Sequence, residues 1–443
     1  MASYIKQAGL GQRGLIIGYD TRFASEDFAQ AAAEVVAGNG IKTYLCPRAT
    51  PTPVISFGIL AKKTGGAIII TASHNPANWN GFKFKTEEGA SASNEVTAEI
   101  EKHLSIVLTT GKINRVPLSQ ALDQGLIEYL DLAPIYAQQV AKLVDLNQLR
   151  QARLKVAIDP MYGAGIGYFK MLLGGGAIQL IEINSERNPL FPGIRPEPIA
   201  PNLVKLSATI KRRKAAVGLA NDGDADRIGV VDEKGVFLTP LQVFALLCLY
   251  LVEVRRERGP IVKTVTDTTM LDRLGEMFNL PVYETPVGFK YVAAIMKAKN
   301  ALIGGEESGG YGFRGHVLER DGILAGLYFL DFMLKTGKTP SQLLDYLYSK
   351  VGPHYYQRQD FTFAEDKRQA INKRISDNLP QSIDRVQVAK KDTTDGFRLM
   401  LADTTWLLIR FSGTEPLLRI YAESDSQERV ERLLQFGREL AGV

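Results

Sequence analysis

The sequence predicts an α/β protein with three mixed α/β domains of similar topology and a smaller C-terminal α+β domain. Short apolar runs rich in β-branched residues recur along the chain, and each ends in a polar loop that contains glycine. Stretches with helical periodicity lie between these runs. Strands that alternate with helices are typical of βαβ units and of a mostly parallel sheet. Ligands bind such sheets at the carboxyl ends of the strands, where these loops fall.

The strands expected to carry the loops follow one another in chain order. They are 15–18 before YDTR, 66–70 before TASHNP, 154–158 before DPMYGAG, 215–220 before NDGDADR, and 301–304 before GEESGG. Helices are expected between them, for example at 27–37 and 322–334. The proline-rich segment 184–202 is expected to be a loop, because proline interrupts helices and strands.

The pattern changes near Gly352, and the segment after it predicts the α+β domain. Its expected elements are strands at 398–401, 405–409 and 417–422, and a final helix with Val430, Leu433, Leu434 and Leu440 on one face. A helix followed by a basic, polar joint is expected at 134–152, and a further strand begins at Ile261. We therefore expect domains at 1–147, 148–257, 258–358 and 359–443.

Composition excludes several classes of protein. The chain has 443 residues, of which 45% are apolar and 23% are charged, unlike disordered, collagen-like or coiled-coil proteins. A net charge of +5 suits a small anionic substrate but is too dilute to indicate nucleic acid. Two cysteines provide no disulfide framework, which fits a reducing compartment. The N-terminus lacks a signal-peptide core, and the longest apolar run, 243–252, is too short for a membrane span. We expect a cytoplasmic protein without membrane partners.

The loop TASHNP holds the first candidates for chemistry. Ser73 follows an apolar strand, and a helix beginning at Pro76 would put backbone N–H groups that favour an anion beside it. His74 is a candidate proton carrier, and Lys83 adds a cation close by in the chain. The alternative is that Ser73 and Asn75 only cap a helix. Lys83 favours a site for an anionic group.

The loop NDGDADR predicts a site for a divalent metal ion. Asp222, Asp224 and Asp226 alternate, so one turn can direct three carboxylates at one point, which is costly without a cation. An EF-hand is disfavoured because Arg227 stands where that loop needs glycine and because 228–231 is strand-like. An Asx-rich turn with solvated carboxylates is the other alternative. Three carboxylates leave coordination positions open, which suits Mg²⁺ in phosphoryl transfer.

Two further loops carry groups that suit a sugar phosphate. In GEESGG, Glu306 and Ser308 can accept and donate hydrogen bonds to a polyol, although a flexible glycine-rich turn is the alternative. In RFSGTEP, Arg410 offers charge, and hydroxyl and backbone donors follow it at Ser412, Gly413 and Thr414. The second loop alone would more often be a plain hairpin turn. No Walker motif is present, which disfavours an ordinary P-loop kinase.

Together and in this order, the five segments resemble the α-D-phosphohexomutase family, most closely its phosphoglucomutase branch. The resemblance implies a heart-shaped enzyme of four domains, each with one active-site loop. It implies that Ser73 is a phosphoserine, whose phosphate binds one Mg²⁺ together with Asp222, Asp224 and Asp226. Catalytic roles are also implied for His74, Lys83 and Arg227. The implied substrate-binding residues are Arg22, Lys290, Glu306, Ser308, Arg320, Arg410, Ser412, Gly413, Thr414 and Arg419.

The implied reaction interconverts glucose 1-phosphate and glucose 6-phosphate through a bisphosphorylated sugar, with glucose 1,6-bisphosphate as intermediate and activator. His74 or Lys83 would move the hydroxyl proton. Phosphomannomutases and phosphoglucosamine mutases of the family usually carry histidine where this chain has Gly309–Gly310, which favours glucose over mannose. From other classes, a non-catalytic sugar-phosphate-binding protein and a Mg²⁺-dependent sugar phosphatase are alternatives. The expected partners are small hexose phosphates, not nucleic acid, and the expected state is a monomer or weak homodimer.

The chain departs from the family pattern at its start. Family members usually open with a Gly-Thr-(Ser/Asp)-Gly-x-Arg segment, which this sequence does not contain. We expect about 40 residues to be missing, the usual size of a strand and helix. Domain 1 would then be incomplete, and this form is expected to be less stable and less active than a longer one.

Overall fold

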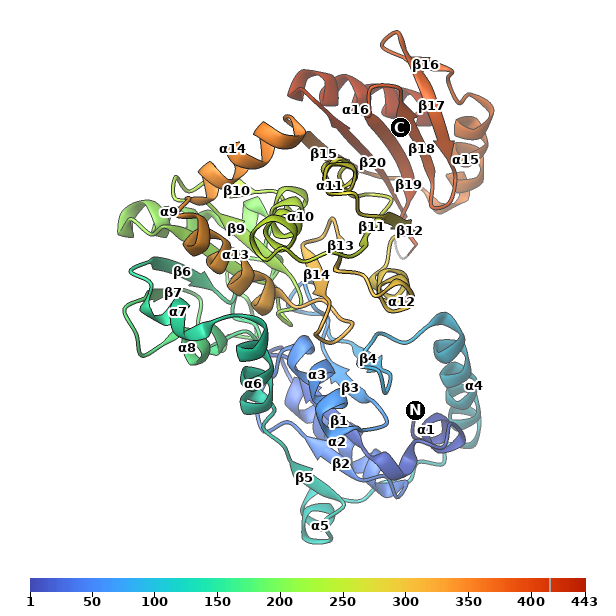
Figure 1. Cartoon of the computed structure of the whole chain (residues 1–443). Helices are drawn as coiled ribbons and strands as arrows, with labels where there is room; N and C mark the ends of the chain where they lie inside the picture. Colours follow the sequence, from blue (N-terminus) through green and yellow to red (C-terminus); the bar gives the residue numbers. More distant parts are fainter. Residues whose placement is uncertain (414–415) are drawn as a thin grey trace.

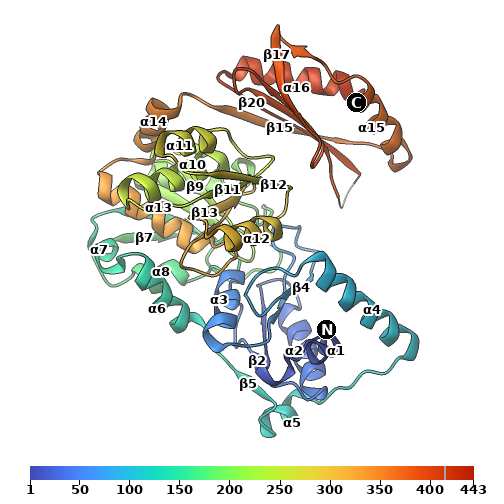
Figure 2. The same cartoon turned by 45° about the vertical axis from the view of Figure 1, so that its right-hand side comes forward.

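The computed structural model describes residues 1–413 and 416–443 and arranges them as four domains along an open arc (Figure 1). The first domain lies at one end of the arc and the C-terminal domain at the other, beside the third domain (Figures 1 and 2). Each domain has its own sheet. The predicted fold class, with three mixed α/β domains and a C-terminal α+β domain, is confirmed, whereas the exact domain limits stay a prediction.

The first domain contains a five-stranded sheet in the order β4-β3-β1-β2-β5, in which only β4 is antiparallel to its neighbour. Its strands are β1 (Leu15–Tyr19), β2 (Thr43–Leu45), β3 (Ala67–Ile70), β4 (Phe82–Lys85) and β5 (Ile127–Tyr129). Its helices are α1 (Ala2–Gln7), η1 (Gly11–Arg13), α2 (Ser25–Gly38), α3 (Thr52–Lys62), α4 (Asn94–Thr110), α5 (Leu118–Asp123) and α6 (Ala133–Leu143). The expected strands before YDTR and TASHNP are β1 and β3, and they lie side by side.

The second domain contains a sheet in the order β10-β9-β8-β6-β7, with β6 parallel to β7 and β8. Its strands are β6 (Lys155–Asp159), β7 (Gln179–Glu182), β8 (Val217–Asn221), β9 (Ile228–Val231) and β10 (Phe237–Leu238). Its helices are α7 (Leu146–Gln151), α8 (Tyr168–Leu173), η2 (Ala200–Asn202) and α9 (Val204–Arg213). Within 134–152, the polar joint expected after the helix is itself helical and forms α7. The carboxylate of Asp145 caps α7 by accepting from the N–H of Gln148.

The third domain contains a four-stranded sheet in the order β12-β11-β13-β14. Its strands are β11 (Ile261–Thr264), β12 (Val282–Thr285), β13 (Ile303–Glu306) and β14 (Gly310–Phe313). Its helices are α10 (Pro240–Leu249), η3 (Tyr250–Val254), α11 (Met270–Phe278), α12 (Phe289–Lys299), α13 (Gly322–Thr336) and α14 (Pro340–Val351). The apolar run 243–252 is buried because α10 packs on α11, α13 and α14 and on β9 of the second domain. No helix in the described ranges is both long and apolar enough to cross a membrane.

The C-terminal domain contains a six-stranded antiparallel sheet in the order β15-β20-β19-β18-β17-β16. Its strands are β15 (Tyr355–Thr362), β16 (Ser382–Ile383), β17 (Val386–Asp392), β18 (Phe397–Leu401), β19 (Trp406–Phe411) and β20 (Leu417–Ser424). Its helices are η4 (Glu365–Lys367), α15 (Arg368–Asp377) and α16 (Gln427–Ala441). Helices α15 and α16 bury one face of the sheet, and Trp406, Leu408 and Tyr421 on the other face pack with Val265 of the third domain. In the last turn of α16, Ala441 is buried and the predicted Leu440 is half-buried against the same core.

Candidate active site

The loop after β3 holds Ser73 against the second domain. The helix expected at Pro76 does not form, and the chain returns through turns to β4, which pairs antiparallel with β3. The N–H of Thr71 donates to the carbonyl of Gly81 at 3.0 Å, which closes the loop. Ser73 is buried in a left-handed conformation with φ of 50°. Its Oγ donates to Oδ2 of Asp222 at 2.9 Å, although the two residues are 149 positions apart in the chain.

The turn between β8 and β9 gathers the three aspartates that the sequence singled out. Each of Asp222, Asp224 and Asp226 is 0% exposed, and one oxygen from each lies within 4.8 Å of the others. Within the described chain, Oδ1 of Asp224 and Oδ1 of Asp226 are buried without hydrogen-bond partners. Buried carboxylate oxygens normally have a partner, and hard divalent cations take such oxygens as ligands. The arrangement therefore fits the predicted Mg²⁺ ion.

The electrostatics of the cluster also fit a bound cation. Burial, together with Asp226 and Asp224, raises the pKa of Asp222 well above its usual range. Burial likewise raises the pKa of Asp226. Burial alone would raise the pKa of Asp224 as well, but Lys83 and a hydrogen bond from Thr52 outweigh it and lower the pKa. A divalent cation would favour the ionised form of all three carboxylates.

Three basic side chains surround the aspartates. Nζ of Lys83 donates to Oδ2 of Asp224 at 3.0 Å. Nε of Arg227 lies 4.0 Å from Oδ2 of Asp222 and 3.8 Å from Oδ1 of Asp226. Arg320 donates to Asp226. Burial lowers the pKa of Lys83, but Asp224 and Asp226 outweigh burial, so the pKa lies above its ordinary value.

The charges of the cluster fit a phosphorylated serine with its metal ion. The three carboxylates are matched by three cations within this cluster. A phosphoserine dianion and a divalent metal would add opposite charges of similar size. The site could therefore hold both without a large net charge.

His74 also lies beside the aspartate cluster, but unlike Lys83 it is uncharged. Nδ1 of His74 is buried and, among the described residues, has no hydrogen-bond partner. The positive charge of Arg227, followed by burial, lowers the pKa of His74 to about 2. The imidazole is therefore neutral at physiological pH. Of the two predicted proton carriers, neutral His74 can accept a proton, whereas charged Lys83 can only donate one.

The sugar loop is the hairpin between β13 and β14. Glu306 is buried at the end of β13 and accepts from Nη1 of Arg320 at 2.8 Å. The N–H of Ile228 donates to the carbonyl of Gly309 at 2.9 Å, which ties this hairpin to the metal loop. A Cβ at Gly310 would lie 2.2 Å from Cδ of Arg320. Glycine at position 310 therefore leaves room for Arg320 to cross the hairpin and reach both Glu306 and Asp226. Ser308 is half-buried in the turn of the hairpin.

Two of the predicted substrate-binding residues lie elsewhere. Nζ of Lys290 donates to Oδ1 of Asn94 at 2.6 Å, at the exposed start of α4 rather than at the aspartate cluster. Arg22 is 0% exposed and lies beneath the Ser73 loop, where its guanidinium binds backbone carbonyls. The structure thus brings together Ser73, the three aspartates, His74, Lys83, Arg227, Arg320 and Glu306. Lys290 lies away from this group, and the donors of Arg22 are directed at backbone carbonyls instead.

The fourth loop lies on the C-terminal domain. Nε of Arg410 donates to Oδ1 of Asp395 at 2.8 Å, and Arg410 stands opposite Arg419 in the register of β19 and β20. Nε of Arg419 lies 3.9 Å from Oδ2 of Asp360. Ser412 is buried, Gly413 follows it, and Thr414 lies outside the described residues.

Sequence reasoning missed a third arginine on this sheet face. Arg358 of β15 stands opposite Tyr421 of β20, two positions from Arg419, so its side chain shares the face of Arg410 and Arg419. Desolvation lowers the pKa of Arg358 and Arg410, but the carboxylates of Asp360 and Asp395 and, more weakly, Glu307 of the sugar loop outweigh it, so the pKa of both arginines is raised. The arginine face therefore lies within electrostatic reach of the sugar loop. The strict alternation of side chains in β15 was the signal that could have found Arg358.

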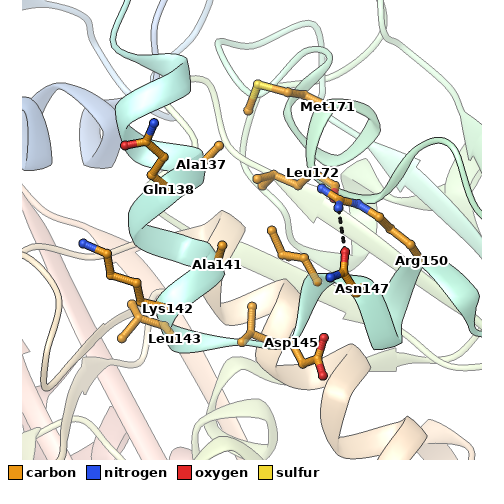
Figure 3. A pocket seen from close by; sticks show the side chains of 12 residues that line it. Ala137, Gln138, Ala141, Lys142, Leu143, Asp145, Asn147, Arg150, Met171 and Leu172 are labelled. Atoms are coloured by element: carbon orange, nitrogen blue, oxygen red, sulfur yellow. Dashed lines mark hydrogen bonds between the residues drawn. The ribbon is translucent and has the colours of Figure 1, made fainter.

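One open cavity lies away from these loops. It has a volume of about 550 Å³ and is bounded by α6, α7 and α8. Figure 3 shows Arg150 hydrogen-bonded to Asn147 at its edge. None of the predicted site residues that the structure describes lines it.

Comparison with protein families covers nearly all of the chain. Models of phosphoglucomutase/phosphomannomutase alpha/beta/alpha domains I, II and III match residues 1–107, 134–235 and 239–351. The model of the C-terminal domain of the same family matches residues 364–439. The chain belongs to the phosphoglucomutase/phosphomannomutase family. Each candidate loop of this phosphohexomutase lies inside one of the four matched segments.

Individual relatives of the family differ in the sugar that their names state. A phosphoglucomutase/phosphomannomutase of Thermococcus kodakarensis is 31% identical over 98% of this chain and 91% of the relative. A probable phosphoglucosamine mutase of Methanosphaera stadtmanae is 30% identical over 99% of this chain and 92% of the relative. The crystal structure of a "putative phosphomannomutase" from Thermus thermophilus is 34% identical and superposes with a TM-score of 0.85, covering 100% of this chain and 93% of the other.

Proposed function

We propose that this phosphohexomutase interconverts glucose 1-phosphate and glucose 6-phosphate, with Ser73 as the phosphoryl carrier. One observation carries the proposal. The hydroxyl of Ser73 lies 2.9 Å from Asp222, inside a buried cluster of three carboxylates that is surrounded by Lys83, Arg227 and Arg320. A plain binding site needs neither a buried serine hydroxyl nor a metal cluster beside it. Phosphoryl transfer through a phosphorylated serine uses both, with cations around the transferring group.

The chain's own residues account for both halves of the reaction. In the first half, the bond between Oγ of phosphorylated Ser73 and phosphorus breaks while a free sugar hydroxyl forms its bond to the same phosphorus. The hydroxyl proton passes to the neutral imidazole of His74, because Lys83 already carries its proton and stabilises negative charge instead. In the second half, the other phosphate of the bisphosphorylated sugar returns to Oγ of Ser73, and the proton is given back to the sugar oxygen. Arg227 and Arg320 lie where they can stabilise charge on the moving group.

Asp222, Asp224 and Asp226 are the residues that would hold Mg²⁺. When bound, the ion supplies positive charge that stabilises the phosphoryl group and the departing serine oxygen. Glu306 and Ser308 of the sugar hairpin would hold sugar hydroxyls. Arg410, Arg419 and Arg358 of the C-terminal domain would bind the phosphate that is not reacting, and glucose 1,6-bisphosphate would serve as intermediate and activator.

The choice of glucose rests on the sugar hairpin. Gly310 stands where the phosphomannomutases and phosphoglucosamine mutases of the family usually carry histidine. A Cβ at this position would overlap the side chain of Arg320, so a larger residue requires Arg320 to shift from the position in which it bonds Glu306 and Asp226. We therefore propose glucose phosphates as the preferred substrates and mannose phosphates as the alternative. Glucosamine phosphate is a further alternative, because one relative is named a probable phosphoglucosamine mutase.

The proposal is tested by a coupled assay that detects glucose 6-phosphate formed from glucose 1-phosphate, with and without glucose 1,6-bisphosphate. A mutase forms glucose 6-phosphate faster with the bisphosphate and releases almost no inorganic phosphate. Stoichiometric phosphate release would favour the phosphatase alternative, and binding without turnover would favour a binding protein. A higher kcat/KM for mannose or glucosamine phosphate would overturn the choice of sugar.

A further inference from the structure

We propose that Arg22 is a positioning residue that fixes the backbone of the Ser73 loop through its guanidinium and does not bind the sugar phosphate. The inference rests on the proposed function, because it concerns how the phosphoryl carrier is held. It replaces the substrate-binding role that the sequence assigned to Arg22. Four backbone carbonyls and one carboxylate carry the argument.

All five N–H groups of the Arg22 side chain are donated to the protein. Nε donates to Oδ2 of Asp20 at 3.1 Å. Nη1 and Nη2 donate to four carbonyls of the loop at 2.6–3.0 Å, namely those of Ser73, Asn75, Pro76 and Trp79. A guanidinium has five donors in a rigid fork. Every N–H of the side chain is therefore engaged within the described part of the chain, and the residue itself is 0% exposed.

The loop has a conformation that needs such support. Ser73 has φ of 50°, which a residue with a side chain adopts rarely and at a cost of about 1 kcal/mol or more. The carbonyl of this strained residue is itself one of the four that Arg22 binds. Asp20 supports the N–H of Ser73 through Thr71. The hydroxyl of Thr71 donates to Asp20 at 2.6 Å and accepts from the N–H of Ser73 at 2.8 Å. Arg22 and Asp20 together bind the backbone on both sides of the reactive side chain.

The same guanidinium connects the loop to the second domain. Its carbon lies 5.1 Å from the ring centre of Phe191 in the proline-rich loop. A Cβ at Gly223 of the metal loop would lie only 2.4 Å from the carbonyl oxygen of Ser73, so the two loops are in direct contact. A shift of the Ser73 carbonyl would therefore change the distance between Oγ and the aspartates. By holding the loop backbone, Arg22 fixes the distance between the Ser73 hydroxyl and the aspartates, although it does not contact the reacting atoms.

Arg22→Lys tests the inference, because lysine keeps a positive charge beside Asp20 but has only three donors and no planar fork. We expect kcat for glucose 1-phosphate to fall about 100-fold, the loss that a misplacement of about 1 Å can cause. We expect KM to change less than about threefold, because no contact with the sugar is lost. Amide hydrogens of peptide 71–81 should exchange faster than in the unaltered protein. Added guanidinium ion should restore part of the activity of Arg22→Ala, since it can reoccupy the same donor site.

Arg187→Lys is the matched control, because Arg187 forms an exposed ion pair with Glu26 across the same two domains. We expect it to leave kcat and exchange unchanged. An Arg22→Lys protein with kcat near that of the unaltered enzyme, or with a raised KM and unchanged kcat, would overturn the inference. If the unaltered protein shows no mutase activity, the proposed function fails, and the exchange of peptide 71–81 still decides the role of Arg22. Unchanged exchange in that peptide would refute the positioning role.

Discussion

At the scale of single residues, the hydroxyl of Ser73 can be removed without removing any part of the core. The side chain is small, and its Oγ donates a hydrogen bond to Asp222. Ser73→Ala should therefore leave the melting temperature nearly unchanged, whereas turnover should fall by several orders of magnitude because the phosphoryl acceptor is lost. Steady-state kinetics and thermal melting check both expectations. Peptide mapping of the active enzyme should find its phosphate on Ser73, and a phosphate on another residue would contradict the assignment.

The metal cluster allows a second prediction at this scale. Asp224→Asn keeps an oxygen ligand but removes the charge, so we expect weaker Mg²⁺ binding in a calorimetric titration and a large loss of kcat. The rise in melting temperature caused by Mg²⁺ should shrink in parallel, because a ligand stabilises only the state that binds it. Asp145→Asn, at the exposed cap of α7, is the matched control and should leave Mg²⁺ binding unchanged. Equal Mg²⁺ affinity in Asp224→Asn and the unaltered protein would refute the cluster as a metal site.

Sequence reasoning at this scale succeeded where a reactive side chain belongs to a local pattern. The aspartates alternate within one turn, and Ser73 follows an apolar strand, so each was identifiable without coordinates. Arg22 and Arg320 belong to no such pattern. A lone arginine has the same local signature whether it binds a ligand, a carboxylate or backbone carbonyls. Only the fold distinguishes Arg22, which is buried under a loop 51–57 residues away, from Arg320, which joins Glu306 to the metal loop.

At the scale of elements, the start of α13 is held by a buried carboxylate that also joins two domains. Asp321 accepts from the N–H groups of Ile323 and Leu324 at 2.9 and 2.8 Å and so caps the helix. The same carboxylate accepts from the hydroxyl of Tyr136 in α6, and Nε2 of His316 lies 2.9 Å from it. The cap of α13 is therefore also a contact between α13 and α6.

This arrangement predicts a graded loss of stability. Tyr136→Phe removes one hydrogen bond and should cost about 1 kcal/mol. Asp321→Ala removes the cap, for about 1 kcal/mol by itself, and leaves the Tyr136 hydroxyl and the His316 ring without their acceptor, so its total cost should be clearly larger. Thermal melting of both variants checks the order. A melting temperature for Asp321→Ala equal to or above that of Tyr136→Phe would contradict the account.

Elements were predictable wherever the hydrophobic period was long enough to be read. The strands at 15–19 and 67–70 and the helix at 322–336 lie close to their expected positions. The expected helix at Pro76 does not form because the chain after Pro76 is held in a closed loop. The Thr71–Gly81 backbone bond closes the loop, and a Cβ at Gly81 would lie 2.6 Å from the Thr71 carbonyl. Tertiary closure of this kind leaves no periodic signal in the sequence.

At the scale of the whole molecule, the order of the loops predicts the order of the domains but not how they meet. The first and third domains are joined by two Lys–Glu pairs that differ mainly in burial. Lys85 of β4 and Glu319 are 2% and 0% exposed and are bonded to each other, with Ser91 accepting from Lys85 at 2.8 Å. Lys297 of α12 and Glu88 form a pair that is about half exposed. Sequence alone does not distinguish these pairs, because both are single charges far apart in the chain.

The two pairs give the last prediction. Burial would raise the pKa of Glu319, but Lys85 and Arg320 outweigh burial and lower it, so the carboxylate stays charged. Lys85→Met should then leave a buried charge without its main partner and destabilise the protein by about 3–5 kcal/mol. The double variant Lys85→Met/Glu319→Gln removes that charge and should recover part of the loss. Lys297→Met breaks the exposed pair and should cost at most about 1 kcal/mol. Melting temperatures of the three variants at one pH and salt concentration provide the test. If Lys85→Met melts no lower than Lys297→Met, or if the double variant melts below Lys85→Met, the buried pair does not hold the first and third domains together.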